Sequence, residues 1–164
     1  GWVAALQNAY VRRADIVNRG FSGYNTEWAR HVLAMILPRA QTSLPASTLL
    51  GQHESIELLV VLLGANDAAI PPSGQHVPLT RYRENLKALV DMVQSPMSRY
   101  YAPNTRVILV TPPPLDEALW AKDCAKDGRP LDRRAATTQK YAEACVKLAR
   151  DLHVPVLDLH SLIL

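Results

Sequence analysis

The chain has 164 residues, 48% of them hydrophobic, so it is long enough to bury the core of one domain. Its net charge of +3 comes from interspersed basic and acidic residues, and with a single Phe the chain lacks the basic, aromatic face of a nucleic-acid binder. No apolar run is long enough to cross a membrane, and the two cysteines form no metal-ligand pattern, which favours a cytoplasmic protein without a metal.

The N-terminal part of the chain alternates helical and strand patterns. Apolar residues recur at helical spacing over residues 1–13, which predicts an amphipathic helix. The segment ADIVNRG, residues 14–20, predicts a short strand, and helical spacing resumes over residues 25–37, just before Pro38. Because the sequence starts at Gly1 inside a helical pattern, we expect it to be a piece of a longer protein.

The middle of the chain predicts two buried strands with a helix between them. The segment IELLVVLLG, residues 56–64, is almost wholly apolar, which is typical of a strand buried on both faces of a parallel sheet. After a loop at residues 70–78, residues 79–94 predict a helix with Thr80 as its N-cap. The segment TRVILVTPPP, residues 105–114, predicts the second strand, which its prolines end.

The C-terminal part predicts a surface excursion, a long helix and a last strand. Residues 116–130 are polar and irregular, residues 131–152 have helical spacing, and residues 154–160 read as a strand. Charges of both signs alternate near the start of the long helix, which indicates a solvated surface: Arg129, Arg133, Arg134, Asp127 and Asp132.

The alternation of strands and helices predicts the fold class. We expect one α/β domain over residues 1–164, a doubly wound, flavodoxin-like three-layer α/β/α sandwich with a mostly parallel sheet. In such folds ligands bind outside the carboxyl ends of the strands. Four polar segments fall at this edge, and they read NRGFSGYNT, GANDAAIPP, TPPPLDE and DLHSL.

Three of these segments carry a family resemblance. The stretches RGFSGYNT, LLGAND and TPPP, in this order and each at a strand tip, resemble the second, third and fourth landmarks of the SGNH (GDSL-type) hydrolases. Within that family they are similar to the isoamyl-acetate-hydrolysing esterases. The resemblance implies a serine esterase that acts on small acetate-type carboxylic esters without a cofactor or metal.

The resemblance also implies two oxyanion-hole donors. They are the backbone N–H of Gly23 in FSGYNT and the side-chain amide of Asn66 in GAND. A glycine lets the backbone approach the substrate, and an asparagine donates without carrying a charge. Taken alone, Gly23 is better explained as a turn or helix-entry glycine and Asn66 as a loop cap. Taken together, at the carboxyl ends of predicted parallel strands, the two residues favour the oxyanion hole. We expect Pro112 and Pro113 to wall the substrate site, although a stiff strand exit explains them as well.

Neighbours of Asn66 are assigned structural roles. Gly64 provides a sharp exit from the strand, and Asp67 is expected to anchor the loop through hydrogen bonds to backbone groups. At the end of the chain, Asp158 is interpreted as a structural residue. For His160 a non-catalytic position at the end of the strand is favoured over a role as general base, which is kept as an alternative because histidine is the usual base.

Two landmarks of the family pattern are absent from the sequence. No serine follows Gly-Asp, and no aspartate has a histidine three residues later. We therefore expect a domain that is incomplete at both ends, lacks the first strand and is inactive alone. Because the missing strand would leave unpaired edges, we also expect poor stability or self-association.

Two other functions are alternatives to a serine esterase. A truncated pseudo-hydrolase would bind an ester or a protein partner without turnover. A nucleotide or phosphate binder on the same sheet topology is disfavoured because the sequence has no Gly-rich phosphate loop.

Overall fold

A computed structural model of the chain describes residues 1–39 and 56–164. Its helices and strands are, in chain order, α1 (Trp2–Ala9), α2 (Thr26–Ile36), β1 (Leu58–Leu62), α3 (Leu79–Gln94), β2 (Arg106–Val110), α4 (Glu117–Lys126), α5 (Ala135–Asp151), β3 (Val156–Leu157) and α6 (Leu159–Ile163).

The described strands form one parallel sheet in the order β1-β2-β3. Leu58 pairs with Arg106 and Leu62 with Val110, whereas β3 meets only the end of β2, where Leu109 pairs with Val156. A parallel sheet whose strands are connected through helices confirms the predicted α/β fold class.

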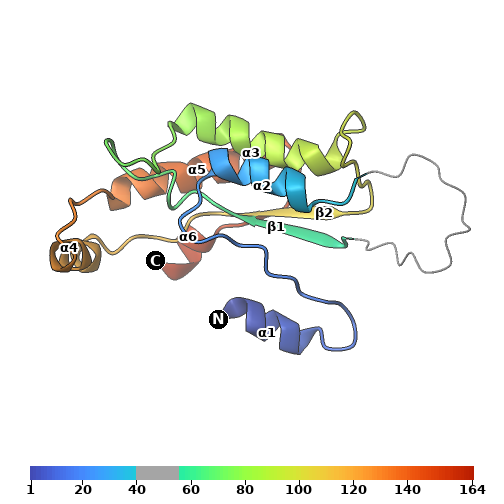
Figure 1. Cartoon of the computed structure of the whole chain (residues 1–164), viewed down its shortest axis with the longest axis horizontal. Helices are drawn as coiled ribbons and strands as arrows, with labels where there is room; N and C mark the ends of the chain where they lie inside the picture. Colours follow the sequence, from blue (N-terminus) through green and yellow to red (C-terminus); the bar gives the residue numbers. More distant parts are fainter. Residues whose placement is uncertain (40–55) are drawn as a thin grey trace, which may run out of the picture.

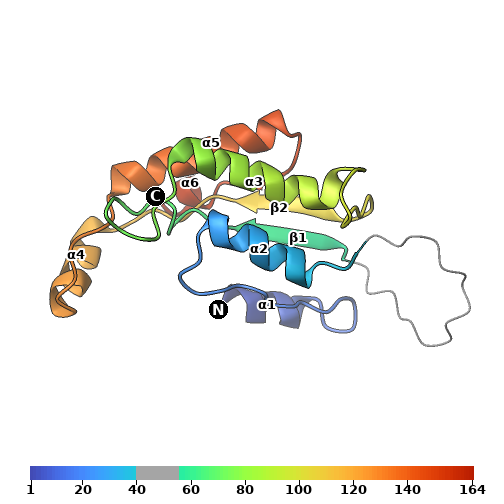
Figure 2. The same cartoon turned by 45° about the horizontal axis from the view of Figure 1, so that its top comes forward.

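Helices α2, α3 and α5 cover one face of the sheet, and α1 lies on the other side (Figures 1 and 2). Helix α3 faces the sheet with an apolar stripe at helical spacing, in which Tyr82, Leu86, Leu89 and Val93 are fully buried. Helix α1 has no buried residue. The described core therefore lies between the sheet and the α2–α3–α5 layer.

The prediction that β1 is buried on both faces is wrong. Val61 faces the core and is 7% exposed, but Leu58, Val60 and Leu62 on the opposite face are 53%, 36% and 36% exposed. An apolar run in the sequence shows that both faces of a strand can be buried. Whether the second face is buried depends on another layer that packs over it. In Figure 1 helix α1 lies on that side of the sheet, and it has no buried residue.

Residues 14–20 are not a strand, contrary to the prediction. Val17 is 62% exposed, and the carbonyl of Ile16 accepts a hydrogen bond from the Gln7 side chain rather than from a neighbouring strand. A short extended segment becomes a strand only when another strand pairs with its backbone.

Two further local predictions are corrected. Residues 116–130 contain helix α4, which Asp116 caps by accepting from the backbone N–H groups of Ala118 and Leu119. Helix α3 spans the predicted residues, but its N-cap is Pro78 rather than Thr80, which lies inside its first turn.

The last predicted strand is also shorter than expected. Asp158 accepts a hydrogen bond from the backbone N–H of Ser161 and so starts helix α6, which leaves only two residues in β3.

Within the two described ranges, no helix combines the length and apolar character that crossing a membrane requires.

Candidate active site

The candidate site lies at the carboxyl edge of the sheet, where three segments meet. They are the turn before α2, the connection between β1 and α3, and the segment that leads into α5 (Figure 1). Each comes from a different part of the sequence, and hydrogen bonds made by their side chains join them.

Gly64 turns the chain sharply out of β1. Its φ of +125° is a backbone conformation that residues with a side chain rarely adopt. An added Cβ would lie 2.8 Å from the Tyr82 hydroxyl and 3.2 Å from Pro112 Cγ. The chain then closes a turn in which the N–H of Ala68 donates to the Gly64 carbonyl at 2.9 Å. This turn presents Asn66 and Asp67 side by side.

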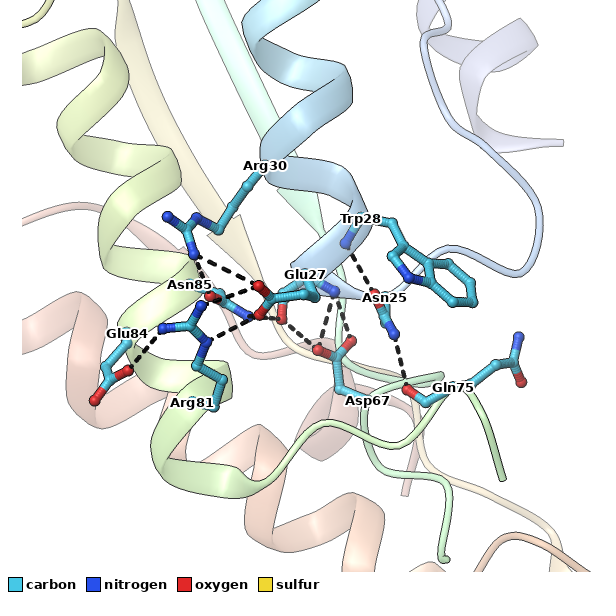
Figure 3. Close-up of polar contacts among 10 residues, drawn as sticks. Asn25, Glu27, Trp28, Arg30, Asp67, Gln75, Arg81, Glu84 and Asn85 are labelled. Carbon is cyan, nitrogen blue, oxygen red and sulfur yellow. Dashed lines mark hydrogen bonds and ion pairs between the residues drawn. The ribbon is translucent and has the colours of Figure 1, made fainter. Parts of the chain in front are cut away.

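Asp67 joins this turn to the start of α2 (Figure 3). Its fully buried carboxylate accepts from the backbone N–H of Thr26 at 3.0 and 3.2 Å and also from the Thr26 hydroxyl. The Asn85 side chain donates to that hydroxyl at 3.1 Å. Burial raises the pKa of Asp67, and its bonds to Thr26 oppose that rise. The predicted anchoring role of Asp67 is confirmed.

Gly23 lies in the turn that precedes α2. Its φ is +81°, and its carbonyl accepts from the Gln75 side chain at 2.8 Å. Asn25 caps α2 by accepting from the N–H of Trp28, and its amide donates to the Gln75 carbonyl (Figure 3). Gln75 therefore bonds to both residues and fixes the Gly23 turn against the β1–α3 connection.

Asn66 reaches the same turn from the tip of β1. Its half-buried side-chain amide donates to the Tyr24 carbonyl at 2.8 Å, and its amide oxygen accepts from Arg133 Nη2 at 2.7 Å. The nitrogen carries two hydrogens, and this contact uses one of them. The two predicted donors, Gly23 and Asn66, thus lie on segments that hydrogen-bond directly to each other.

Arg133 was missed by the sequence reasoning, which placed it on a solvated surface. Its side chain is only 12% exposed, donates to Asp132 at 3.0 Å and lies 4.9 Å from the centre of the Trp120 ring. The predicted position on a solvated surface is correct for Arg129 and Arg134, whose side chains are 44% and 51% exposed. A useful signal was the position of Arg133 just before a helix that starts at the carboxyl edge.

The two candidate wall residues differ in burial. Pro112 is fully buried and packs beside Gly64, whereas Pro113 is half-buried. Their packing agrees with a stiff exit from β2. A role for either in lining the substrate site stays a prediction.

Asp158 and His160 do not form a hydrogen-bonded pair in the described contacts. Asp158 accepts from the hydroxyls of Ser161 and Thr111 at 2.7 and 3.2 Å, and these bonds, with Ser161 first, lower its pKa. The backbone N–H of buried His160 donates to the Thr111 hydroxyl at 2.9 Å. Both residues thus join β2 to α6, which agrees with the structural role expected for Asp158.

No group of three or more His, Cys, Asp or Glu residues in the described ranges could hold a metal ion. Cys124 and Cys145 are both buried and form no disulfide. Burial raises the pKa of the Cys145 thiol to about 11.

Sequence comparisons match the whole chain to one family. The GDSL-like lipase/acylhydrolase family matches over residues 1–164. The isoamyl acetate-hydrolyzing esterase 1 homologs of Mus musculus and Homo sapiens are 41% and 40% identical to the chain, over 99% of its length and 60% of theirs. The GDSL esterase/lipase WDL1 of Oryza sativa subsp. japonica is 33% identical over 97% of the chain and 56% of its own length.

A solved structure supports the fold. A carbohydrate acetylesterase family member from Sinorhizobium meliloti superposes with a TM-score of 0.62 at 19% identity, over 95% of this chain and 69% of that one. The chain spans about 60% of the length of the mouse and human relatives. The match over residues 1–164, together with these relatives, shows that the chain belongs to the GDSL-like lipase/acylhydrolase family.

Proposed function

We propose that this chain supplies the oxyanion-binding half of a serine esterase that hydrolyses small, acetate-type carboxylic esters through an acyl-enzyme. The observation that carries the proposal is the hydrogen bond from the Asn66 amide to the Tyr24 carbonyl, which holds the two candidate donor segments together at the carboxyl edge of the sheet.

The chemistry requires such donors because attack on an ester carbonyl creates a negatively charged oxygen. The N–H of Gly23 and the second N–H of Asn66 would each donate to that oxygen. Groups already held in place need little reorganisation when the charge develops, and removing one such donor typically costs about 2.7–4 kcal/mol of transition-state stabilisation.

The serine nucleophile and histidine base of this mechanism are assigned to no residue of the chain. The sequence contains neither Gly-Asp-Ser nor Asp-x-x-His, and the bonds of Asp158 and His160 join β2 to α6. The acetate-type substrate class is proposed because the mouse and human relatives are named isoamyl acetate-hydrolyzing esterase homologs.

The test is an Asn66→Ala substitution in the full-length gene product, assayed with p-nitrophenyl acetate. We expect kcat to fall by about 100- to 1,000-fold, because one oxyanion donor is lost. The matched control is Asn104→Ala, which removes an exposed amide from a surface turn and should leave kcat unchanged.

Two results would contradict the proposal. Full activity in the Asn66→Ala protein would exclude Asn66 as an oxyanion donor. A folded wild-type protein that binds an ester without hydrolysing it would instead support the pseudo-hydrolase alternative, in which the same residues bind without turnover.

A further inference from the structure

We propose that Arg133 is a positioning residue for the oxyanion hole. One nitrogen of its guanidinium group holds the Asn66 amide in place and, through Gln75, also holds the Gly23 turn. This inference rests on the proposed function, since it explains how the two donors are kept in place.

The geometry centres on a single nitrogen atom. Arg133 Nη2 donates to Asn66 Oδ1 at 2.7 Å and to Gln75 Oε1 at 2.8 Å. Each of these two amides then donates, at 2.8 Å, to the turn before α2: Asn66 to the Tyr24 carbonyl and Gln75 to the Gly23 carbonyl. The cation thus reaches consecutive residues of that turn through two separate side chains.

A cation at the amide oxygen determines which way the Asn66 side chain faces. Reversing the amide would place its NH₂ group against the guanidinium and its oxygen against the Tyr24 carbonyl, so both hydrogen bonds would become repulsive. The observed orientation keeps the nitrogen available as a donor. Hydrogen bonds to charged groups are roughly twice as strong as neutral ones, and they polarise the groups that they join.

Arg133 is itself held on several sides. Its Nη1 donates to Asp132 at 3.0 Å, and its guanidinium lies over the Trp120 ring, whose Nε1 donates to the same aspartate at 3.0 Å. The backbone of Asp132 accepts from the N–H of Ile70 at 2.7 Å, which ties this segment to the β1–α3 connection. A guanidinium confined in this way can orient another side chain, because it has little freedom of its own.

The neighbouring Arg134 provides a matched control. Its side chain is 51% exposed and pairs with Glu117 at 3.2 Å, so it carries the same charge at the next position without touching Asn66 or Gln75. Exposed pairs of this kind contribute little to stability. Arg134→Gln therefore changes the charge of the molecule as Arg133→Gln does, but leaves the hydrogen bonds from Arg133 to Asn66 and Gln75 intact.

The decisive experiment is a double-mutant cycle in the full-length gene product, with p-nitrophenyl acetate as substrate. We expect Arg133→Gln to lower kcat by about 10- to 100-fold with little change in KM, because the donor is misplaced in the transition state. In the double variant Arg133→Gln/Asn66→Ala the loss should be smaller than the product of the two single losses, because Arg133 acts partly through Asn66 and partly, through Gln75, on the Gly23 turn. Arg134→Gln should match the wild type.

Several outcomes would overturn the inference. If Asn66→Ala is inactive while Arg133→Gln retains wild-type kcat, the positioning role is wrong and the proposed function stands. If the two losses multiply in the double variant, Arg133 does not act through Asn66. If Asn66→Ala is fully active, the proposed function itself fails.

A spectroscopic measurement tests the same contact without using catalysis. In an ¹⁵N-labelled protein, the two side-chain N–H resonances of Asn66 are identified by their loss in Asn66→Ala. We expect these resonances to shift and to exchange faster with solvent in Arg133→Gln, but not in Arg134→Gln. If Arg133→Gln folds poorly, Arg133→Lys is the second variant, and the same changes are expected in it. Unchanged resonances in a folded Arg133 variant would contradict the inference.

Discussion

At the scale of single residues, Gly64 determines where the polar end of β1 points. Its backbone has a φ of +125°, and an added Cβ would meet the Tyr82 hydroxyl at 2.8 Å. That hydroxyl is fixed, since it belongs to a fully buried side chain that donates to the Leu63 carbonyl at 3.2 Å. The turn that carries Asn66 and Asp67 therefore depends on the absence of a side chain at Gly64.

We predict that Gly64→Ala lowers the free energy of unfolding by about 1–3 kcal/mol, because it adds backbone strain and a steric clash. The control is Gly74→Ala in the same connection, where an added Cβ would meet nothing within 4 Å and φ lies outside the left-handed region. Urea unfolding of both variants measures the difference. Equal stability of the two would contradict the assigned role of Gly64.

The sequence identified some residues of the candidate site and missed another for a physical reason. Gly23 and Asn66 stand at strand tips or turns, so local patterns and a family resemblance identified them as candidates. Arg133 contacts a residue 67 positions away in the chain, and its own flanking sequence resembles exposed charge. A hydrogen bond across that separation depends on how the segments pack, which no local pattern encodes.

At the scale of elements, α2 is held to α3 by a charged cluster around Glu27 (Figure 3). Arg81 donates to both oxygens of the Glu27 carboxylate at 2.9 Å, and Asn85 donates to one of them at 2.9 Å. The bonds from Arg81 first, then from Asn85, lower the pKa of Glu27 to about 2. Because α2 starts directly after the Gly23 turn, this cluster also supports the candidate site.

The pKa of Glu27 predicts a pH dependence of stability. A carboxylate whose pKa is lower in the folded than in the unfolded protein stabilises the fold above its ordinary pKa of 4.5, and this contribution is lost as the pH falls toward about 2. We expect Glu27→Gln to lower the free energy of unfolding at pH 7 by about 0.5–1 kcal/mol, because the pair is partly exposed. The substitution should also make the free energy of unfolding depend less on pH between pH 4.5 and about 2.

Chemical unfolding at several pH values measures this effect, with Glu143→Gln as the control. Glu143 lies on the exposed side of α5 and accepts a hydrogen bond from the exposed Gln139 side chain at 2.9 Å. The raised pKa of Asp67 works in the opposite direction, since its contribution is lost as the pH rises through its folded pKa. Glu27→Gln retains Asp67, so the difference between the variant and the wild type isolates Glu27. An identical pH profile in the two proteins would contradict the prediction.

Elements were predictable where the pattern is local. Helices α2, α3 and α5 have apolar stripes at helical spacing, and the sequence alone located them to within a few residues. The strand expected at residues 14–20 was wrong because strand formation depends on a partner. Helix α4 was missed, although Asp116 followed by Glu117 was an identifiable start signal.

At the scale of the whole molecule, the described sheet has an exposed apolar face beside an open edge. Strand β2 pairs with one edge of β1, and the described residues provide no strand for the other. Leu58, Val60 and Leu62 are exposed and alternate with inward-facing positions that include the buried Val61. Helices α2, α3 and α5 lie on the other face of the sheet (Figures 1 and 2). An open edge beside exposed aliphatic side chains is a surface on which chains associate.

We therefore predict that the 164-residue chain, produced alone, is poorly stable or self-associates. Sedimentation velocity at several protein concentrations should show species larger than a monomer, and Val60→Lys should reduce their fraction by placing a charge on the exposed face of β1. The control is Gln139→Lys, which adds the same charge on the exposed side of α5, away from that edge. A sharp two-state melt of a monomer at all concentrations would contradict the prediction, because the open edge and the exposed apolar face would then be tolerated without a partner.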